Sequence, residues 1–225
     1  MLLENLHGSF ARYIFISSVD VYIRGITTPK DENTPRQANQ LTGPIGEYMI
    51  HKRRLEDELM AYGSFHSIPY TILRPSFLYG PYNYAPRETY YFQKIAANES
   101  IPVPTDSTAM FQFLYILDLA NIILSCLRNL ITENNIYNVS SPEVLTYADF
   151  MDALRSVSEI PFTTVPMSCD DIVTNAIPLP FPMFPEETEL FNCDKLMRDI
   201  GPRFTPFGQG LAKAYRFYMK SHKRI

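Results

Sequence analysis

Three side chains have the types and spacing needed for proton transfer: Ser18, Tyr48 and Lys52. Tyr48 and Lys52 are four residues apart, so on a helix they project from one face. A phenol with an ordinary pKa of about 10 is a poor base at neutral pH, and a neighbouring ammonium favours its ionised form. A serine hydroxyl can donate to the oxygen of a substrate alcohol or carbonyl. Together the three predict proton transfer coupled to hydride transfer by a nicotinamide.

The Tyr-x-x-x-Lys spacing is a weak signal alone, because the sequence contains it twice. Tyr90 and Lys94 form the second instance. Taken in isolation, either pair is best interpreted as a tyrosine beside a solvated lysine on a helix surface. The elements around each pair must therefore distinguish them.

The elements around Ser18 and Tyr48 have the order of a βαβ unit. Residues 13–18 form an apolar, β-branched and aromatic run typical of a buried parallel strand. Residues 45–62 have a helical pattern, and residues 70–73 form the next strand, which Pro75 ends. Ser18 thus falls at the carboxyl end of a parallel strand, where open α/β sheets bind their ligands.

The remainder of the chain predicts further helices and strands with one irregular segment. The expected elements are a helix over 89–97, a strand over 113–116, an apolar helix over 117–130, a strand over 136–139, and helices over 147–156 and 207–220. Residues 177–185 contain four prolines, so they cannot form a regular element. We expect this segment to lie extended over an apolar surface, as a lid or as packing.

Composition excludes several function classes. The net charge of −4 offers no electrostatic footprint for nucleic acid, and no apolar run of about 18 residues is present to span a membrane. The three cysteines are unclustered and the four histidines are scattered, so neither a disulfide framework nor a metal site is expected. Because no disulfide framework is expected, the sequence predicts a reducing compartment, the cytoplasm.

Five sequence blocks carry a specific resemblance. Their order and spacing are similar to those of the extended short-chain dehydrogenases/reductases, the NAD-dependent epimerase/dehydratase family. The blocks are FISSVDVY (15–22), YMIHK (48–52), LRPSFLYGP (73–81), FLYILDLA (113–120) and YNVSSPEVLTYADF (137–150). Only the first Tyr-x-x-x-Lys pair, at Tyr48, lies at the distance from the serine strand that this family requires.

The resemblance implies an α/β fold, an incomplete Rossmann-like doubly wound parallel sheet with a smaller mixed α/β substrate lobe. It assigns residues 1–80 with 112–140 to the partial Rossmann-like domain, and residues 81–111 with 141–225 to the substrate-binding lobe. The implied cofactor is NAD or NADP. The implied substrate is a nucleotide sugar or a related polyol, transformed by an oxidoreductase or isomerase.

The resemblance also implies roles for individual residues. Ser18 and Tyr48 would act on the substrate hydroxyl, and Arg87 would contact a substrate anion. The implied catalytic residues are Ser18, Tyr48 and Lys52, and the implied cofactor-binding residues are Tyr48, Lys52, Pro75, Ser76 and Leu78.

The largest departure from the family pattern is a missing motif. The family begins with a strand and a G-x-x-G-x-x-G turn that binds pyrophosphate, but here the first glycines are Gly8 and Gly25. We expect about four strands to precede residue 1 in a complete sheet. Without them the strand at 13–17 is an apolar sheet edge, so we expect a homo-oligomer or an upstream polypeptide that completes the sheet.

Smaller departures concern the substrate. Asp20 stands where 4,6-dehydratases carry a glutamate, but Val19 replaces their aspartate, which argues against dehydratase chemistry. Phe77 replaces a substrate-binding asparagine, and Phe111 stands where UDP-sugar epimerases place a pyrophosphate-binding arginine. A second function class therefore stays open: a non-catalytic fragment or interaction module from a split or truncated epimerase.

Overall fold

The computed structural model describes residues 2–5, 8–25, 29–37 and 42–222. Its helices are α1 (Leu2–Asn5), α2 (Gly43–His66), α3 (Glu88–Ala96), α4 (Ile116–Arg128), α5 (Tyr147–Val157), α6 (Cys169–Thr174), α7 (Asp194–Asp199) and α8 (Phe207–His222), with 3-10 turns η1 (Val19–Val21), η2 (Leu130–Thr132) and η3 (Pro185–Glu187). None of the helices described is long and apolar enough to cross a membrane.

The strands described form three parallel sheets. Their bounds are β1 (Tyr13–Ile16), β2 (Tyr70–Pro75), β3 (Phe77–Tyr79), β4 (Ile101–Pro104), β5 (Phe113–Tyr115), β6 (Asn135–Val139) and β7 (Thr164–Met167). The main sheet has the order β1-β2-β6, and β3-β5 and β4-β7 form two-stranded sheets. Strands β1 and β2 pair in a register that runs from Tyr13 opposite Tyr70 to Ile16 opposite Leu73.

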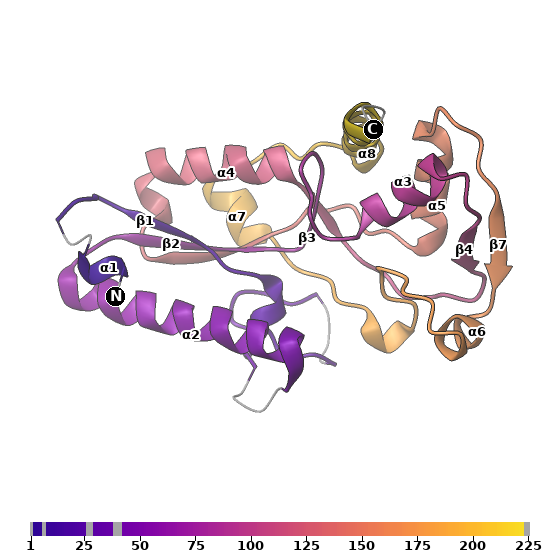
Figure 1. Cartoon of the computed structure of the whole chain (residues 1–225). Helices are drawn as coiled ribbons and strands as arrows, with labels where there is room; N and C mark the ends of the chain where they lie inside the picture. Colours follow the sequence, from indigo (N-terminus) through magenta and orange to yellow (C-terminus); the bar gives the residue numbers. More distant parts are fainter. Residues whose placement is uncertain (1, 6–7, 26–28, 38–41, 223–225) are drawn as a thin grey trace.

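Helices cover both faces of the main sheet, as in a doubly wound α/β fold. Helix α2 lies on one face, and α4 and α7 lie on the other (Figure 1). Side chains alternate along the strands, so Phe15 and Ile72 pack with Leu59 of α2, while Ile16 and Leu73 pack with Leu119 of α4. The α/β fold class expected from the sequence is confirmed.

Helix α2 is the long element that carries Tyr48 and Lys52. It begins beside Pro44, whose fixed φ suits a first helical turn, and ends at Ser67 in the left-handed conformation at φ 53°. Gly63 lets the helix approach the sheet, because a Cβ there would lie 2.6 Å from the ring of Tyr70. This close approach fixes the height of the helix above the strand that ends at the site.

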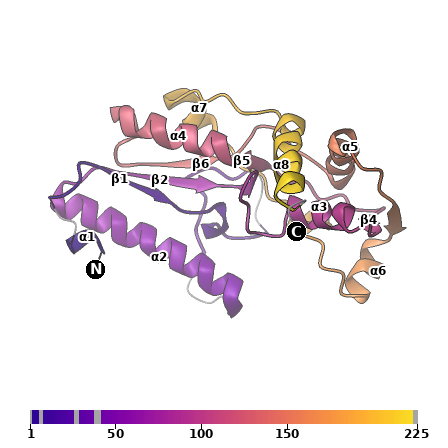
Figure 2. The same ribbon diagram turned by 45° about the horizontal axis from the view of Figure 1, so that its top comes forward.

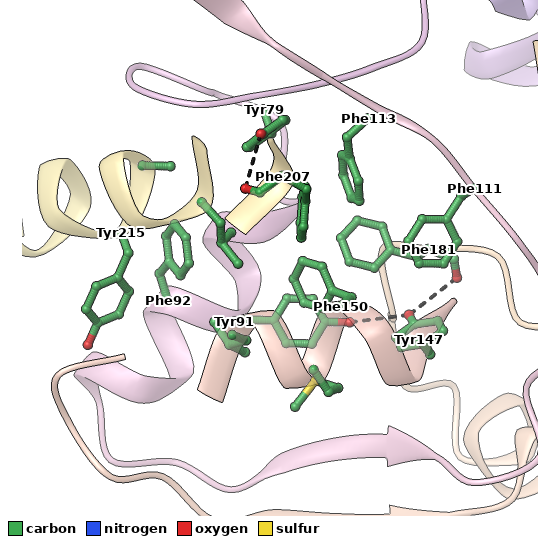
Figure 3. Packing of buried hydrophobic residues seen from close by; sticks show 14 of the residues in the cluster. Tyr79, Tyr91, Phe92, Phe111, Phe113, Tyr147, Phe150, Phe181, Phe207 and Tyr215 are labelled. Carbon is green, nitrogen blue, oxygen red and sulfur yellow. Dashed lines mark hydrogen bonds between the residues drawn. The ribbon is translucent and has the colours of Figure 1, made fainter. Parts of the chain in front are cut away.

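The second lobe has a core made largely of aromatic rings. Phe111, Phe113, Phe150, Phe181 and Phe207 are buried together, with ring centroids about 5 to 6 Å apart (Figure 3). Helices α3, α5 and α8 surround this cluster, with α8 lying between the lobe and the sheet (Figure 2). Aromatic pairs at these separations add to the stabilisation from burial alone.

Most expected elements occur with small shifts at their ends. Strand β2 continues two residues further than expected, to Pro75, whose missing N–H is tolerated in the last position of a strand. The proline-rich residues 177–184 form no regular element, and Phe181 from this segment is buried in the aromatic cluster. Strands β3, β4 and β7 were not expected, because each has only three or four residues and two contain proline.

Packing crosses the division expected between the two domains. Helix α7 lies in the segment assigned to the substrate lobe, yet Leu196 is buried in the core of the sheet half and Lys195 Nζ donates to Ile136 O at 3.0 Å. Conversely, Tyr79 and Phe113 belong to the aromatic cluster of the lobe. The two halves therefore share side chains along their boundary.

Candidate active site

Ser18 leaves the main sheet where β1 ends and caps η1. Its Oγ accepts from Asp20 N at 3.1 Å and donates to Asp20 Oδ2 at 2.8 Å. Ser17 N donates to Leu73 O at 2.7 Å, which holds this end of the chain against β2. The hydroxyl is therefore fixed at the carboxyl edge of a parallel strand, as its position in the sequence predicts.

Tyr48 and Lys52 lie on successive turns of α2 and face this edge. Lys52 Nζ donates to Ile16 O at 2.8 Å and lies 5.8 Å from the centroid of the Tyr48 ring. A side-chain hydrogen bond joins Tyr48 to Ser18, and the phenol remains 45% exposed. The three residues singled out for chemistry therefore meet, although 30 residues separate Ser18 from Tyr48.

All the residues expected at the site line one cavity of about 660 Å³, here called the catalytic cavity. It is formed at the carboxyl ends of β1 and β2, beside the loop that follows β3 and the start of α4. The expected residues that line it are Ser18, Tyr48, Lys52, Pro75, Ser76, Leu78 and Arg87. The volume lies within the range of small-molecule and cofactor sites.

The pKa of Tyr48 shifts in the direction opposite to the one expected from its neighbour. Burial raises this pKa above its ordinary value, the hydrogen bond with Ser18 lowers it, and the Asp20 carboxylate raises it. Lys52 is itself affected by burial, which lowers its pKa, while Glu56 raises it. Because the Lys52 ammonium points to the Ile16 carbonyl, Tyr48 is a protonated phenol at neutral pH in this arrangement.

Arg87 supplies a second cation to the cavity. Its guanidinium lies 4.9 Å from the centroid of the Phe77 ring and donates to Leu78 O at 3.1 Å. Burial lowers the pKa of Arg87, and the Asp20 and Glu88 carboxylates raise it. The same guanidinium lowers the pKa of Tyr48. Arg87 is thus placed to attract a substrate anion and to favour an ionised phenol.

The structure adds residues to the site, among them Asp20, which the sequence pattern linked only to dehydratase chemistry. Asp20 lies at the cavity through its bond with Ser18, and Asn83, Tyr82 and Tyr84 come from the loop after β3. The sequence could have predicted that this loop lies at the site, because the loop follows a parallel strand at the edge where such sheets bind ligands. Its backbone was not predictable: Tyr82 has a φ of 64°, a conformation rare outside glycine.

The second Tyr-x-x-x-Lys pair lies elsewhere. Lys94 Nζ is 5.3 Å from the centroid of the Tyr90 ring and pairs with Glu99 at 3.1 Å, and neither residue lines the catalytic cavity.

Within the described part of the chain, no three His, Cys, Asp or Glu side chains gather as metal ligands would. The free cysteines are Cys126, Cys169 and Cys193.

A Rossmann-like parallel sheet carries Ser18, Tyr48 and Lys52 together at its carboxyl edge, which is the arrangement that the sequence resemblance implies. The chain belongs to the NAD dependent epimerase/dehydratase family, whose family model matches residues 2–140. A curated relative, the chloroplast stem-loop binding protein of 41 kDa b from Arabidopsis thaliana, is 28% identical over 150 residues, which are 67% of this chain and 37% of the relative.

Solved structures show the same fold. The chain resembles UDP-glucose 4-epimerase of Thermotoga maritima, solved with UDP-glucose, at a TM-score of 0.75 and 18% identity, covering 98% of this chain and 68% of that one. UDP-glucuronic acid 4-epimerase of Bacillus cereus, solved with NAD, matches at 0.76 and 17%, covering 98% and 66%. The chain thus spans about two thirds of these structures and just over a third of the plant relative.

Proposed function

We propose that this chain carries the catalytic half of an NAD(P)-dependent oxidoreductase or epimerase that acts on a secondary alcohol of a nucleotide sugar or related polyol. The observation that carries the proposal is the meeting of Ser18, Tyr48 and Lys52 in one cavity. Family membership and the likeness to nucleotide-sugar epimerases support it. In this proposal, residues 81–111 with 141–225 bind the substrate.

The residues at the catalytic cavity fit the nicotinamide end of the cofactor. Lys52 is a half-buried cation that lines the cavity, and Pro75 and Leu78 give the cavity an apolar wall. Ser76 adds a buried hydroxyl that accepts from Ser140 at 2.8 Å. We assign Lys52 and Tyr48 to the nicotinamide ribose, and Pro75, Ser76 and Leu78 to the ring. When bound, the cofactor supplies hydride transfer.

The chain's own residues move the proton. As a protonated phenol, Tyr48 can donate to the oxygen of a substrate carbonyl, and Ser18 holds that oxygen in place. In the oxidising direction, Tyr48 must first lose its proton and then accept one from the substrate hydroxyl. Burial raises the pKa of Tyr48 most, and the Asp20 carboxylate raises it while Arg87 lowers it, so both charges affect the balance between the directions.

The test is a titration of the 225-residue chain with NADH, followed by nicotinamide fluorescence, which the absence of Trp leaves clear. We expect saturable micromolar binding that Lys52→Met weakens, and turnover that Tyr48→Phe abolishes. Tyr90→Phe with Lys94→Met is the matched control and should change neither. Absence of binding at millimolar NADH would favour the alternative, a non-catalytic fragment or interaction module.

A second candidate function is binding of a nucleic-acid stem-loop such as one of RNA, because the plant relative is a stem-loop binding protein. The net charge of −4 argues against it, because phosphate contacts dominate such affinity. Fluorescence polarisation with a labelled RNA stem-loop separates the two candidates. RNA binding predicts a salt-dependent signal that Tyr48→Phe leaves intact, whereas the oxidoreductase proposal predicts none.

We also propose that β1 pairs with a further strand, from a second copy of this chain or from a polypeptide that completes the sheet. Among the described residues β1 pairs only with β2, and all four of its side chains are half-buried, whereas those of β2 are fully buried. Sedimentation should show association that Ile14→Pro abolishes, since Tyr13 N and Ser17 N already donate towards β2. A stable wild-type monomer would exclude self-association.

A reducing compartment such as the cytoplasm fits the free cysteines and remains part of this proposal. Burial raises the pKa of Cys126 and Cys169 to about 11 each, so both thiols resist oxidation as well.

A further inference from the structure

A second cavity of about 390 Å³ adjoins the catalytic cavity and is here called the distal cavity. Asp20 lines both cavities, and its carboxylate accepts the hydroxyl hydrogen of Ser18. Phe77 and Leu78 are consecutive residues that line the distal and the catalytic cavity respectively. A molecule whose alcohol lies at Ser18 and Tyr48 can therefore extend past Asp20 into the distal cavity.

The charges around the distal cavity are predominantly negative. Four carboxylates line it, and among its lining residues Arg24 is the sole cation, with a side chain 60% exposed. The carboxylates are those of Asp20, Glu186, Glu187 and Glu189.

Hydrogen bonds and ion pairs hold these carboxylates in place, and Asp20 pairs with Arg24 at 3.9 Å. Glu187 Oε2 accepts from Met183 N at 2.8 Å and from Phe184 N at 3.1 Å, and both donors are neutral. Glu189 pairs with the buried Lys30 at 2.7 Å, so the negative charge of the cavity rests mainly on Glu186 and Glu187. A phosphate in this cavity would meet repulsion rather than the cationic clamps that phosphate sites use.

The remaining wall is apolar and aromatic. Phe77, Phe111, Phe181 and Phe191 line the cavity, and Phe111 and Phe181 stack with centroids 5.1 Å apart. Phe111 and Phe181 belong to the buried aromatic cluster, and packing against the other rings holds them in place (Figure 3). Phe111 and Phe181 are 1% and 4% exposed and Arg87 lies over Phe77, so the rings supply an apolar wall that suits an alkyl or aromatic group.

We propose that the distal cavity binds the part of the substrate remote from the reacting alcohol, and that it selects an uncharged or cationic organic group over a phosphate-bearing one. The inference rests on the proposed function, because it uses the catalytic cavity to define which end of the substrate reacts. Within that function it favours a polyol or glycoside that bears an aromatic, alkyl or amino group, and it disfavours a nucleoside diphosphate.

The probes are tryptamine and indole-3-acetate, aromatic compounds with the same ring and opposite charge. The protein contains no Trp, so indole fluorescence anisotropy reports the bound probe directly. We expect saturable binding of tryptamine and binding of indole-3-acetate that is weaker by about tenfold or more. We also expect UDP to leave tryptamine bound. Equal binding of the two probes, no binding of tryptamine, or displacement by UDP at concentrations similar to those of tryptamine would overturn the proposal.

Charge-reversal variants test whether the carboxylates of the distal cavity cause the preference for the cationic probe. Glu186 is exposed at the cavity, so Glu186→Lys should weaken tryptamine binding and strengthen that of indole-3-acetate. Glu58→Lys, an exposed position on α2 away from the cavity, changes the net charge equally and should alter neither. Identical effects of the two variants would contradict the assignment to this cavity.

The result is separable from the proposed function. Tyr48→Phe removes turnover but lies outside the distal cavity, so it should leave tryptamine binding unchanged. If NADH fails to bind while tryptamine selection persists, the oxidoreductase proposal fails and the cavity assignment stands. If NADH binds and the two probes bind equally, the oxidoreductase proposal stands and the charge selection fails.

Discussion

The two halves of the molecule differ in how completely they bury their apolar side chains. In the lobe around α3, α5 and α8, Phe113, Phe150 and Leu211 are at most 2% exposed and pack against rings on several sides. In the sheet half, every side chain of β1 is only half-buried, and Phe15 packs at the margin of a small cluster. The lobe completes its own core, whereas the sheet half has apolar surface that a further element would cover.

The difference bears on function because the catalytic cavity is at the half whose edge strand is only half-buried. Ser18 follows β1 directly, and Lys52 donates to the Ile16 carbonyl. The geometry of the site therefore depends on the least covered strand of the sheet.

The largest expected effect compares one phenylalanine from each half. Phe150→Ala should destabilise the protein by about 3 to 5 kcal/mol, because it leaves a cavity in a rigid aromatic cluster. Phe15→Ala should cost about 1 kcal/mol, since the half-buried ring loses less contact. Urea denaturation followed by tyrosine fluorescence measures both. Equal losses would mean that β1 is as well covered in solution as the lobe.

The next effect tests how tightly the lobe packs around α8. A Cβ on Gly210 would lie 2.1 Å from the hydroxyl oxygen of Tyr79, so Gly210→Ala should cost about 1 to 3 kcal/mol. Gly208 is in the same helix, and a Cβ there meets no atom within 4 Å. Gly208→Ala should therefore be neutral or stabilise by a few tenths of a kcal/mol. Thermal unfolding of both variants gives the comparison, and similar midpoints would show that Tyr79 can move aside.

Helix caps extend the comparison between the halves. Thr146 and Asp149 form a reciprocal capping box at the start of α5, whereas Thr42 makes no side-chain cap bond at the start of α2. Thr146→Ala should cost about 1 kcal/mol and Thr42→Ala close to nothing. The hydrogen bonds to Thr146 lower the pKa of Asp149, so this contribution is present above the ordinary pKa of aspartate and is lost as the pH falls. Denaturation at neutral and acidic pH measures it, and a pH-independent loss would contradict the box.

Much of this architecture was predictable from the sequence because local patterns determine it. The apolar run at 13–16 and the helical pattern after Pro44 specify β1 and α2, and parallel topology then places Ser18 near Tyr48. The short strands β3, β4 and β7 were not predictable, since they exist only through pairing with distant segments. The role of Asp20 at two cavities also depends on that pairing.

Electrostatics at the site was the least predictable property, because it depends on where each side chain points. The spacing of Tyr48 and Lys52 suggested an acidic phenol, yet Lys52 bonds the Ile16 carbonyl and burial dominates the pKa of Tyr48. A helical spacing fixes which residues share a face, but it does not fix the burial of a phenol or the partner of an ammonium.

The smallest expected effect concerns the pKa of Tyr48 at the open half. The Asp20 carboxylate raises this pKa, so Asp20→Asn should lower it. Ionisation of the phenol would then begin at lower pH, and the alkaline limb of any alcohol oxidation would move in the same direction.

NMR of an isotope-labelled tyrosine ring carbon, assigned with Tyr48→Phe, follows the titration without requiring turnover. Asp152→Asn, an exposed change on α5, is the control. An unchanged titration in Asp20→Asn would show that solvent at the sheet half screens the carboxylate, whereas a shift would show that the two groups interact through a medium of low dielectric constant.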